Sequence, residues 1–181
     1  MHLQKIHWKI YFKDPSEARP DDFFRVFNTW IPDSPEIFID VADYQHVHDG
    51  PITLLAGHYA DLMLDDTDRR RGFLYARKQP MEGNNAAKIS ESFKAFTKAC
   101  RRLSDDPLFE GGLSFKTDEI LFTINDRALA PNTSATFQGV KPDLETFFSA
   151  LLGKGNFTLI HQDDPKQRFS VIISAKKELP I

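Results

Sequence analysis

The chain has 181 residues, of which 41% are hydrophobic and 27% charged, and its formal net charge is -3. This composition is typical of a globular protein and is long enough for one substantial hydrophobic core, so we expect a single domain over residues 1–181. The slightly acidic balance provides no overall positive field that would attract nucleic acid or an anionic membrane.

The sequence favours a cytoplasmic protein. No segment approaches the roughly 18 apolar residues of a membrane-spanning helix, and the N-terminal residues alternate in polarity rather than forming a secretory signal. The single cysteine, Cys100, excludes an internal disulfide and a cysteine-rich zinc motif, which fits a reducing compartment. We expect no membrane association.

The first predicted element is a strand from Ile6 to Lys13, in which apolar and polar residues alternate. Its polar face is expected to be a solvated basic surface or to cover a ligand. Binding of single-stranded nucleic acid is unfavoured, because only Tyr11 supplies an aromatic ring for base stacking. The residues of this polar face are Lys5, His7, Lys9, Tyr11 and Lys13.

A short core-facing helix is predicted from Phe23 to Ile31, where apolar residues fall on one helical stripe and Pro32 follows. A strand is predicted from Ile37 to Val41. The segment from Ile52 to Leu64 reads as one long strand, because every second residue is apolar apart from His58. We therefore expect His58 to be a buried histidine with a hydrogen-bond partner, or a general base or ligand lining a pocket.

A charged turn then leads into a strand from Phe73 to Lys78, which closes a hairpin. The strongest helical pattern runs from Ile89 to Leu103, with apolar residues at alternating spacings of four and three. Asn84 or Asn85 is positioned to cap its start. Cys100 lies within the apolar stripe, which predicts a small buried residue rather than a nucleophile.

The last third is predicted to contain two hairpins and a helix. The first hairpin joins residues 113–116 to 120–125, and the second joins 157–161 to 169–175. Between them, a helix spans Leu144 to Leu152, with Pro142 near its start. The predicted order is therefore β-α-β-β-β-α-β-β-α-β-β, which indicates an α+β fold: a largely antiparallel sheet with about three helices packed on one face.

The segment from Asp40 to Pro51, together with Gly57-His58 and Ala60-Asp61, resembles a family of uncharacterised bacterial proteins that carry a DVADYxHVxxGP segment. The likeness covers mainly the N-terminal half, and His48 is not part of the family pattern. The family has no assigned activity to carry over. The resemblance implies a bacterial origin.

The Asp- and His-rich stretch between residues 40 and 61 is the best candidate for a functional site. If strands 37–41 and 52–64 pair, we expect Asp40 or Asp43 to lie beside His58 and form an acid–base pair. A metal site is the alternative, because histidines two residues apart point to the same side of an extended backbone. The catalytic candidates are Asp40, Asp43, His46, His58 and Asp61, and the metal-ligand candidates are His46, His48 and His58.

No nucleophile elbow, phosphate-binding glycine loop or zinc-protease motif accompanies these residues. We therefore favour a non-enzymatic binding or scaffold module, with a polar Asp/His-lined loop and strand at 40–61, that needs no cofactor. Its partner is undefined, and a homodimer is one possibility. The alternative is a metal-dependent or Asp-His acid/base enzyme that acts on a small molecule.

Overall fold

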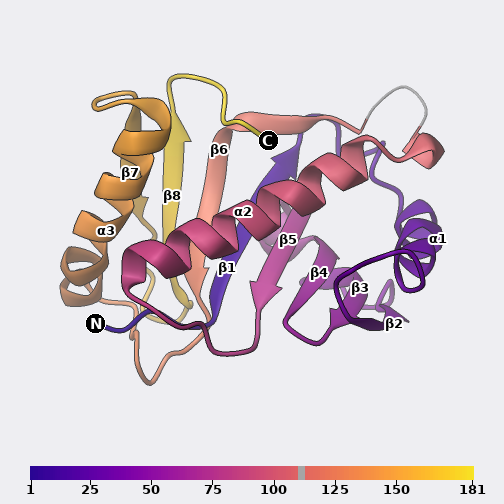
Figure 1. Ribbon diagram of the computed structural model, residues 1–181, viewed down its shortest axis with the longest axis horizontal. Helices are drawn as coiled ribbons and strands as arrows, with labels where there is room; N and C mark the ends of the chain where they lie inside the picture. The colour runs from indigo at the N-terminus through magenta and orange to yellow at the C-terminus, as the bar shows by residue number, and fades with distance from the viewer. Residues whose placement is uncertain (110–112) are drawn as a thin grey trace.

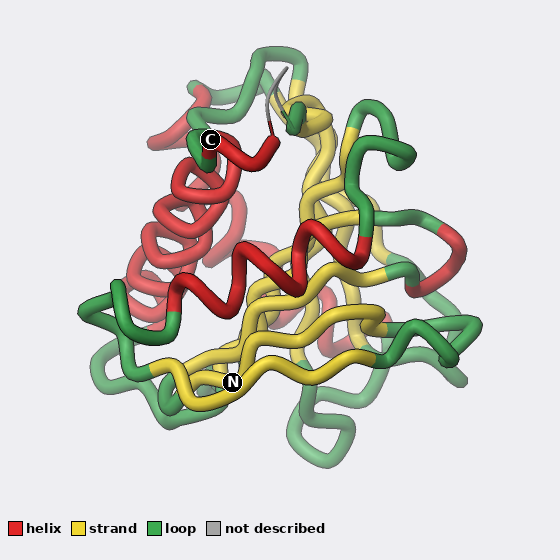
Figure 2. The backbone as a smooth tube through the Cα atoms, turned by 90° about the vertical axis from the view of Figure 1, so that its right-hand side faces the viewer, coloured by secondary structure: helices red, strands yellow, loops and turns green. Residues whose placement is uncertain are grey.

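The computed structural model describes residues 1–109 and 113–181. Within them, eight strands form one sheet in the order β2-β3-β4-β5-β1-β6-β8-β7, and every neighbouring pair is antiparallel. Three α-helices pack against this sheet (Figures 1 and 2), which confirms the predicted α+β class. The elements are β1 (Ile6–Phe12), α1 (Pro20–Trp30), β2 (Phe38–Asp43), β3 (Pro51–Gly57), β4 (Ala60–Asp65), β5 (Gly72–Arg77), α2 (Asn85–Ser104), β6 (Phe115–Ile124), α3 (Ser134–Leu152), β7 (Phe157–His161) and β8 (Phe169–Ala175), with short 3-10 turns at Thr67–Arg69 and Pro107–Phe109.

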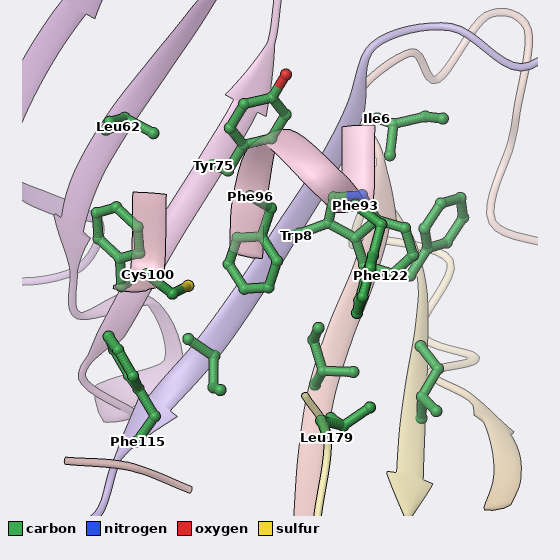
Figure 3. Close-up of a cluster of buried hydrophobic side chains, with 14 of the residues drawn as sticks. Ile6, Trp8, Leu62, Tyr75, Phe93, Phe96, Cys100, Phe115, Phe122 and Leu179 are labelled. Carbon is green, nitrogen blue, oxygen red and sulfur yellow. The ribbon is translucent and has the colours of Figure 1, made fainter. Parts of the chain in front are cut away.

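The hydrophobic core lies between the central strands and the helices. Trp8 of β1 is fully buried, and its ring makes edge contacts with Phe93 of α2 and Phe148 of α3. Phe12, on the same face of β1, contacts Phe23 of α1 in the same way. All three helices therefore cover one face of the sheet. Figure 3 shows Trp8 at the centre of this cluster.

Local signals explain the two longer helices. The side chain of Asn84 accepts a hydrogen bond from the backbone N–H of Ala87, so Asn84 caps α2. Thr133 caps α3 in the same manner, and the helix therefore begins earlier than the predicted Leu144. Pro142 lies inside α3, but on its exposed side, where water can bond the carbonyl group that the missing N–H leaves free.

The prediction of one long strand from Ile52 to Leu64 is wrong. The chain reverses after Gly57, and β3 pairs with β4 as a tight hairpin in which Leu55 lies opposite Leu62. A side chain at Gly57 would place its first carbon 2.2 Å from the carbonyl oxygen of Ala60, so the close turn requires glycine. The apolar residues continue to alternate through the turn, so the periodicity of the sequence does not reveal the reversal of the chain.

The predicted hairpin at residues 113–125 is also wrong, because β6 is one continuous strand. In its pairing with β1, the short interval from Ile10 to Phe12 faces the longer interval from Phe115 to Ile120. The polar residues expected to form a turn therefore form an irregularity within the strand. This error and the missed hairpin at Gly57 cancel in the strand count, and the observed order is β-α-β-β-β-β-α-β-α-β-β.

Strand β1 is buried on both faces, which corrects the expectation of a solvated polar side. His7, Lys9 and Tyr11 point away from the helices, yet only 7%, 3% and 7% of their surfaces are exposed. The strand lies in the middle of the sheet between β5 and β6, and residues of the β4–β5 and β7–β8 loops surround its polar face.

Candidate functional site

An apolar pocket of about 180 Å³ opens on the helix-covered side of the sheet, near its β2 edge. Its lining comes from the end of α1, the start of β2, the β3–β4 turn, the middle of α2, and strands β4 and β5. Trp30 of α1 and Phe38 of β2 face each other with ring centroids 6.4 Å apart. Leu62 and Tyr75, which are cross-strand neighbours, add an apolar surface from the sheet.

Two alanines in α2 leave the space that this pocket occupies. Ala95 and Ala99 are four residues apart, so they lie on the same face of the helix and both line the pocket. The neighbouring positions Phe96 and Cys100 are fully buried in the core. Phe96 and Cys100 therefore pack α2 against the core. Ala95 and Ala99 are too small to fill the space beside β2, which stays open as the pocket.

The mouth of the pocket is apolar as well. Ile37 and Tyr59, which both belong to the lining, are 56% and 50% exposed. The β3–β4 turn holds Tyr59 in place, because the side chain of Asp61 accepts a hydrogen bond from the N–H of Gly57 at 3.0 Å. Large exposed apolar side chains beside an open pocket are a common feature of binding sites.

Each cation near the mouth has a carboxylate partner. Lys98 pairs with Glu36, and Arg77 pairs with Glu91 at 3.4 Å. Burial works to raise the pKa of Glu36, but hydrogen bonds from Lys98 and Ser34 outweigh it and lower that pKa. Glu36 therefore stays ionised and neutralises Lys98.

Arg102, which also lines this region, is ion-paired with the exposed carboxylate of Asp33 at 3.7 Å. Its guanidinium lies 4.3 Å from the ring centre of Trp30 and donates a hydrogen bond to the carbonyl of Asp33. Inside the pocket, burial raises the pKa of Tyr75, so its phenol is neutral at physiological pH. The pocket therefore suits an uncharged apolar group, such as an aromatic or branched aliphatic side chain.

The structure separates the predicted acid–base pair. Asp40 lies opposite Ala56 and Asp43 opposite Thr53, so neither is the cross-strand neighbour of His58. Asp40 accepts a hydrogen bond from the N–H of Val41, and Asp43 accepts one from the N–H of Gln45. Both carboxylates therefore bond backbone N–H groups one or two residues further along the chain.

The remaining candidates also lie apart. His46 and His48 are exposed in the loop between β2 and β3. Asp61 accepts one hydrogen bond, from the N–H of Gly57, and is ion-paired with Lys78 at 2.7 Å, so its side chain stabilises the turn. His58 is the one predicted residue that lines the pocket, but it is exposed at the turn rather than buried on a strand.

The metal alternative finds no geometric support. Among residues 1–109 and 113–181, no group of three or more histidine, cysteine or carboxylate side chains lies close enough to hold an ion. His58 packs edge-on against the ring of Tyr59, with centroids 4.6 Å apart, instead of meeting His46 or His48. The segment at 40–61 thus contains most of β2, the loop after it, β3 and the β3–β4 turn, and only this turn, with His58, lines the pocket.

Sequence reasoning missed most of the pocket. The core-facing stripe predicted from Phe23 to Ile31 includes Trp30, which is buried as expected, but the stripe does not indicate that Trp30 also lines a pocket. Ala95 and Ala99 lie beside the apolar stripe of α2, where the pattern predicts no pocket. Small residues that flank such a stripe, facing an aromatic residue from another element, were the available signal. It becomes readable only when the pairing of the elements is known.

Comparison with known proteins adds no identity: neither a scan against protein-family models nor a search of curated proteins gives a match. No helix among the described residues is long and apolar enough to cross a membrane.

Proposed function

We propose that the protein is a non-enzymatic binding module that holds an aromatic or branched aliphatic group of its partner in the pocket beside β2. The observation that carries this proposal is a solvent-open pocket of about 180 Å³ with an almost wholly apolar lining and a neutralised rim. A cavity of about 150 Å³ lined by apolar side chains is large enough to bind benzene. Trp30 and Tyr75 would contact the bound group.

The edge of the sheet beside the pocket supports a protein segment as the partner. β2 is the outermost strand of the sheet formed by the described residues, so its outer backbone groups have no partner strand there. Ile37, just before this strand, and Ile39 within it are 56% and 62% exposed. An extended segment that pairs with such an edge could place one apolar side chain in the adjacent pocket.

A second copy of the chain is one partner of this kind, and a homodimer would join two β2 edges around a twofold axis. Mass in solution as a function of concentration, compared between the wild type and Ile39→Lys, separates self-association from binding to another protein.

We place the protein in the cytoplasm, supported by a buried, unpaired Cys100, and regard the resemblance noted above as support for a bacterial origin.

The pocket is tested by calorimetric titration with toluene as the probe. Ala99→Leu fills the pocket without removing a contact, so we expect it to weaken toluene binding by about tenfold or more. The matched control is Ala86→Leu, an exposed position near the start of the same helix, which should leave affinity unchanged. Equal toluene affinity in the Ala99→Leu variant and the wild type would refute this site.

A further inference from the structure

A second cavity, of about 440 Å³, lies on the other face of the sheet, away from the three helices. The strand register defines its floor. His7, Thr123 and Ser170 form one cross-strand row on β1, β6 and β8. The next row on the same face consists of Lys9, Leu121, Ile172 and Leu74.

Two loops form the walls of this cavity. One is the connection between β4 and β5, which contributes Thr67 and Arg70, and the other is the loop between β7 and β8, which contributes Gln162 and Arg168. These loops enclose the centre of the sheet, and they account for the low exposure of the polar residues on β1. The cavity is therefore a recess with a built polar floor rather than an open surface.

Several polar groups of the cavity satisfy one another. Lys9 and Asp65 form an ion pair at 2.5 Å, with side chains only 4% and 3% exposed. Arg70 pairs with Glu119 at 2.7 Å, and its guanidinium lies 3.7 Å from the ring centre of Tyr11. These ion pairs stabilise the β4–β5 loop. Because Lys9 and Arg70 are already paired, they have little capacity left to bind a ligand.

His7 and Arg168 differ from these groups. Within the described residues, the His7 imidazole makes no hydrogen bond, although 93% of the residue surface is covered (its exposure is 7%). Arg168 donates one hydrogen bond, to Asn125 at 3.2 Å, and no carboxylate of the described chain lies within ion-pair distance. Among the described residues, Glu119 Oε1 is the one fully buried side-chain N or O atom without a hydrogen-bond partner, so the His7 nitrogens open onto the cavity and can bond a ligand there.

The positive charge of Arg168 favours an anion beside His7, whose own ring is neutral at physiological pH because its pKa is lowered. Burial lowers the pKa of His7 to about 4, and the positive charge of Arg168 contributes in the same direction. Of the carboxylates among the described residues that line the cavity, Asp65 is ion-paired with Lys9, while Asp68, Asp163 and Asp164 are exposed on the rim, as Arg168 is.

We propose that this cavity binds a small organic anion, with its carboxylate or phosphate group held by His7 and Arg168 and its apolar body over Leu121 and Ile172. The volume exceeds that of a bare oxyanion, and the floor changes from polar to apolar between one cross-strand row and the next. A molecule with one charged end and one apolar end matches this division. The site is separate from the pocket beside β2, so the two proposals stand or fall independently.

Binding is tested with benzenesulfonate, whose charge does not change with pH, and with benzyl alcohol as the uncharged counterpart. We expect benzenesulfonate to bind more tightly, and Arg168→Gln to weaken its binding by about tenfold or more. The control is Arg127→Gln, an exposed arginine whose guanidinium bonds the carbonyl of Lys166 in the same loop. Benzoate and phenyl phosphate then show whether the site prefers a carboxylate or a phosphate.

An Arg168→Gln variant that binds benzenesulfonate like the wild type, or a benzyl alcohol affinity that equals the sulfonate's, would overturn the proposal. A second measurement does not depend on a variant. A bound anion favours protonated His7, so the NMR titration midpoint of its ring should rise above about 4 when benzenesulfonate is present. Affinity should then fall as pH rises through the midpoint of the complex. A midpoint unchanged by saturating benzenesulfonate would likewise contradict the assignment of His7.

Discussion

Lys9 and Asp65 form an ion pair that water barely reaches, with side-chain exposures of 4% and 3%. Removing Lys9 leaves the Asp65 carboxylate buried without a counter-charge. Lys9→Met should therefore destabilise the fold by about 3 to 5 kcal/mol. The double variant Lys9→Met/Asp65→Asn leaves no stranded charge and should be no less stable than the single Lys9→Met. Denaturant titration of the variants measures both values.

The exposed pair of Lys5 and Asp126 provides the comparison for this cycle. Its lysine side chain is 51% exposed, so removing the pair should change the free energy of unfolding by about 1 kcal/mol or less. Strict additivity of Lys9→Met and Asp65→Asn would show that the buried groups are not coupled, and would make the pair incidental to the cavity floor.

The pH dependence of stability tests the environment of His7. Its folded pKa is about 4, below the ordinary histidine value of 6.5, so the unfolded chain binds a proton in a range where the folded protein does not. Stability should therefore fall as pH drops from about 6.5 to about 4, with a slope of up to about 1.4 kcal/mol per pH unit from this residue. His7→Gln should remove that part of the slope.

Unfolding free energies of the wild type and His7→Gln, measured across the acidic range, isolate this contribution. The carboxylates with lowered pKa, such as Glu36 and Glu119, titrate in both proteins and cancel in the difference. The two curves should run parallel above about pH 7, where both states of His7 are neutral. Parallel curves over the whole range would mean that His7 is not buried in the manner described.

At the scale of elements, helix α2 is the part that the sequence predicted best. Its stripe and its Asn84 cap follow from local spacing, and Phe93, Phe96 and Cys100 are buried as expected. We predict that Phe96→Ala destabilises the protein by about 3 to 5 kcal/mol, since its ring is fully buried. Phe24→Ala, at a position 38% exposed on α1, is the control and should cost much less. If denaturant titration shows similarly small losses of unfolding free energy for both variants, the assignment of Phe96 to the core is wrong.

Two strand predictions failed for a shared physical reason. The alternation from Ile52 to Leu64 persists through a reversal because Gly57 and Ala60 allow the backbone to turn between apolar residues. Polar residues between Phe115 and Ile120 resemble a turn, yet the pairing with β1 absorbs them in a continuous strand. Periodicity reports which residues face a core, whereas the direction of the chain depends on partners distant in the sequence.

The candidate site was predictable only in part for the same reason. His58 was selected because it interrupts an apolar pattern, and it does line the pocket, although from an exposed turn. The aspartates at 40, 43 and 61 form local turn hydrogen bonds or ion pairs, which is a common use of this residue type. Trp30 and Ala99 come from helices far from β2 in the sequence, so only the assembled fold brings them together.

At the scale of the whole molecule, the two faces of the sheet have different chemistry. The helix-covered face ends at the β2 edge in an apolar pocket, while the opposite face is recessed over β1 into a cavity with polar and apolar rows. Side chains on one face of the central strand β1 pack into the core, and those on its other face line this second cavity. These two recesses share no lining residue, and the apolar one carries the proposed function.

A crystal structure of the protein grown with bromobenzene tests that central claim most directly, because the bromine atom can be located by its anomalous scattering. The proposed function predicts one bromobenzene ring in the pocket, in contact with Trp30 and Tyr75 and beside Ala99 of α2. Crystals of Ala99→Leu grown in the same way should lack that ring. A wild-type pocket that remains without bromobenzene, or bromine found only on the outer surface, would contradict the assignment of this pocket as the binding site.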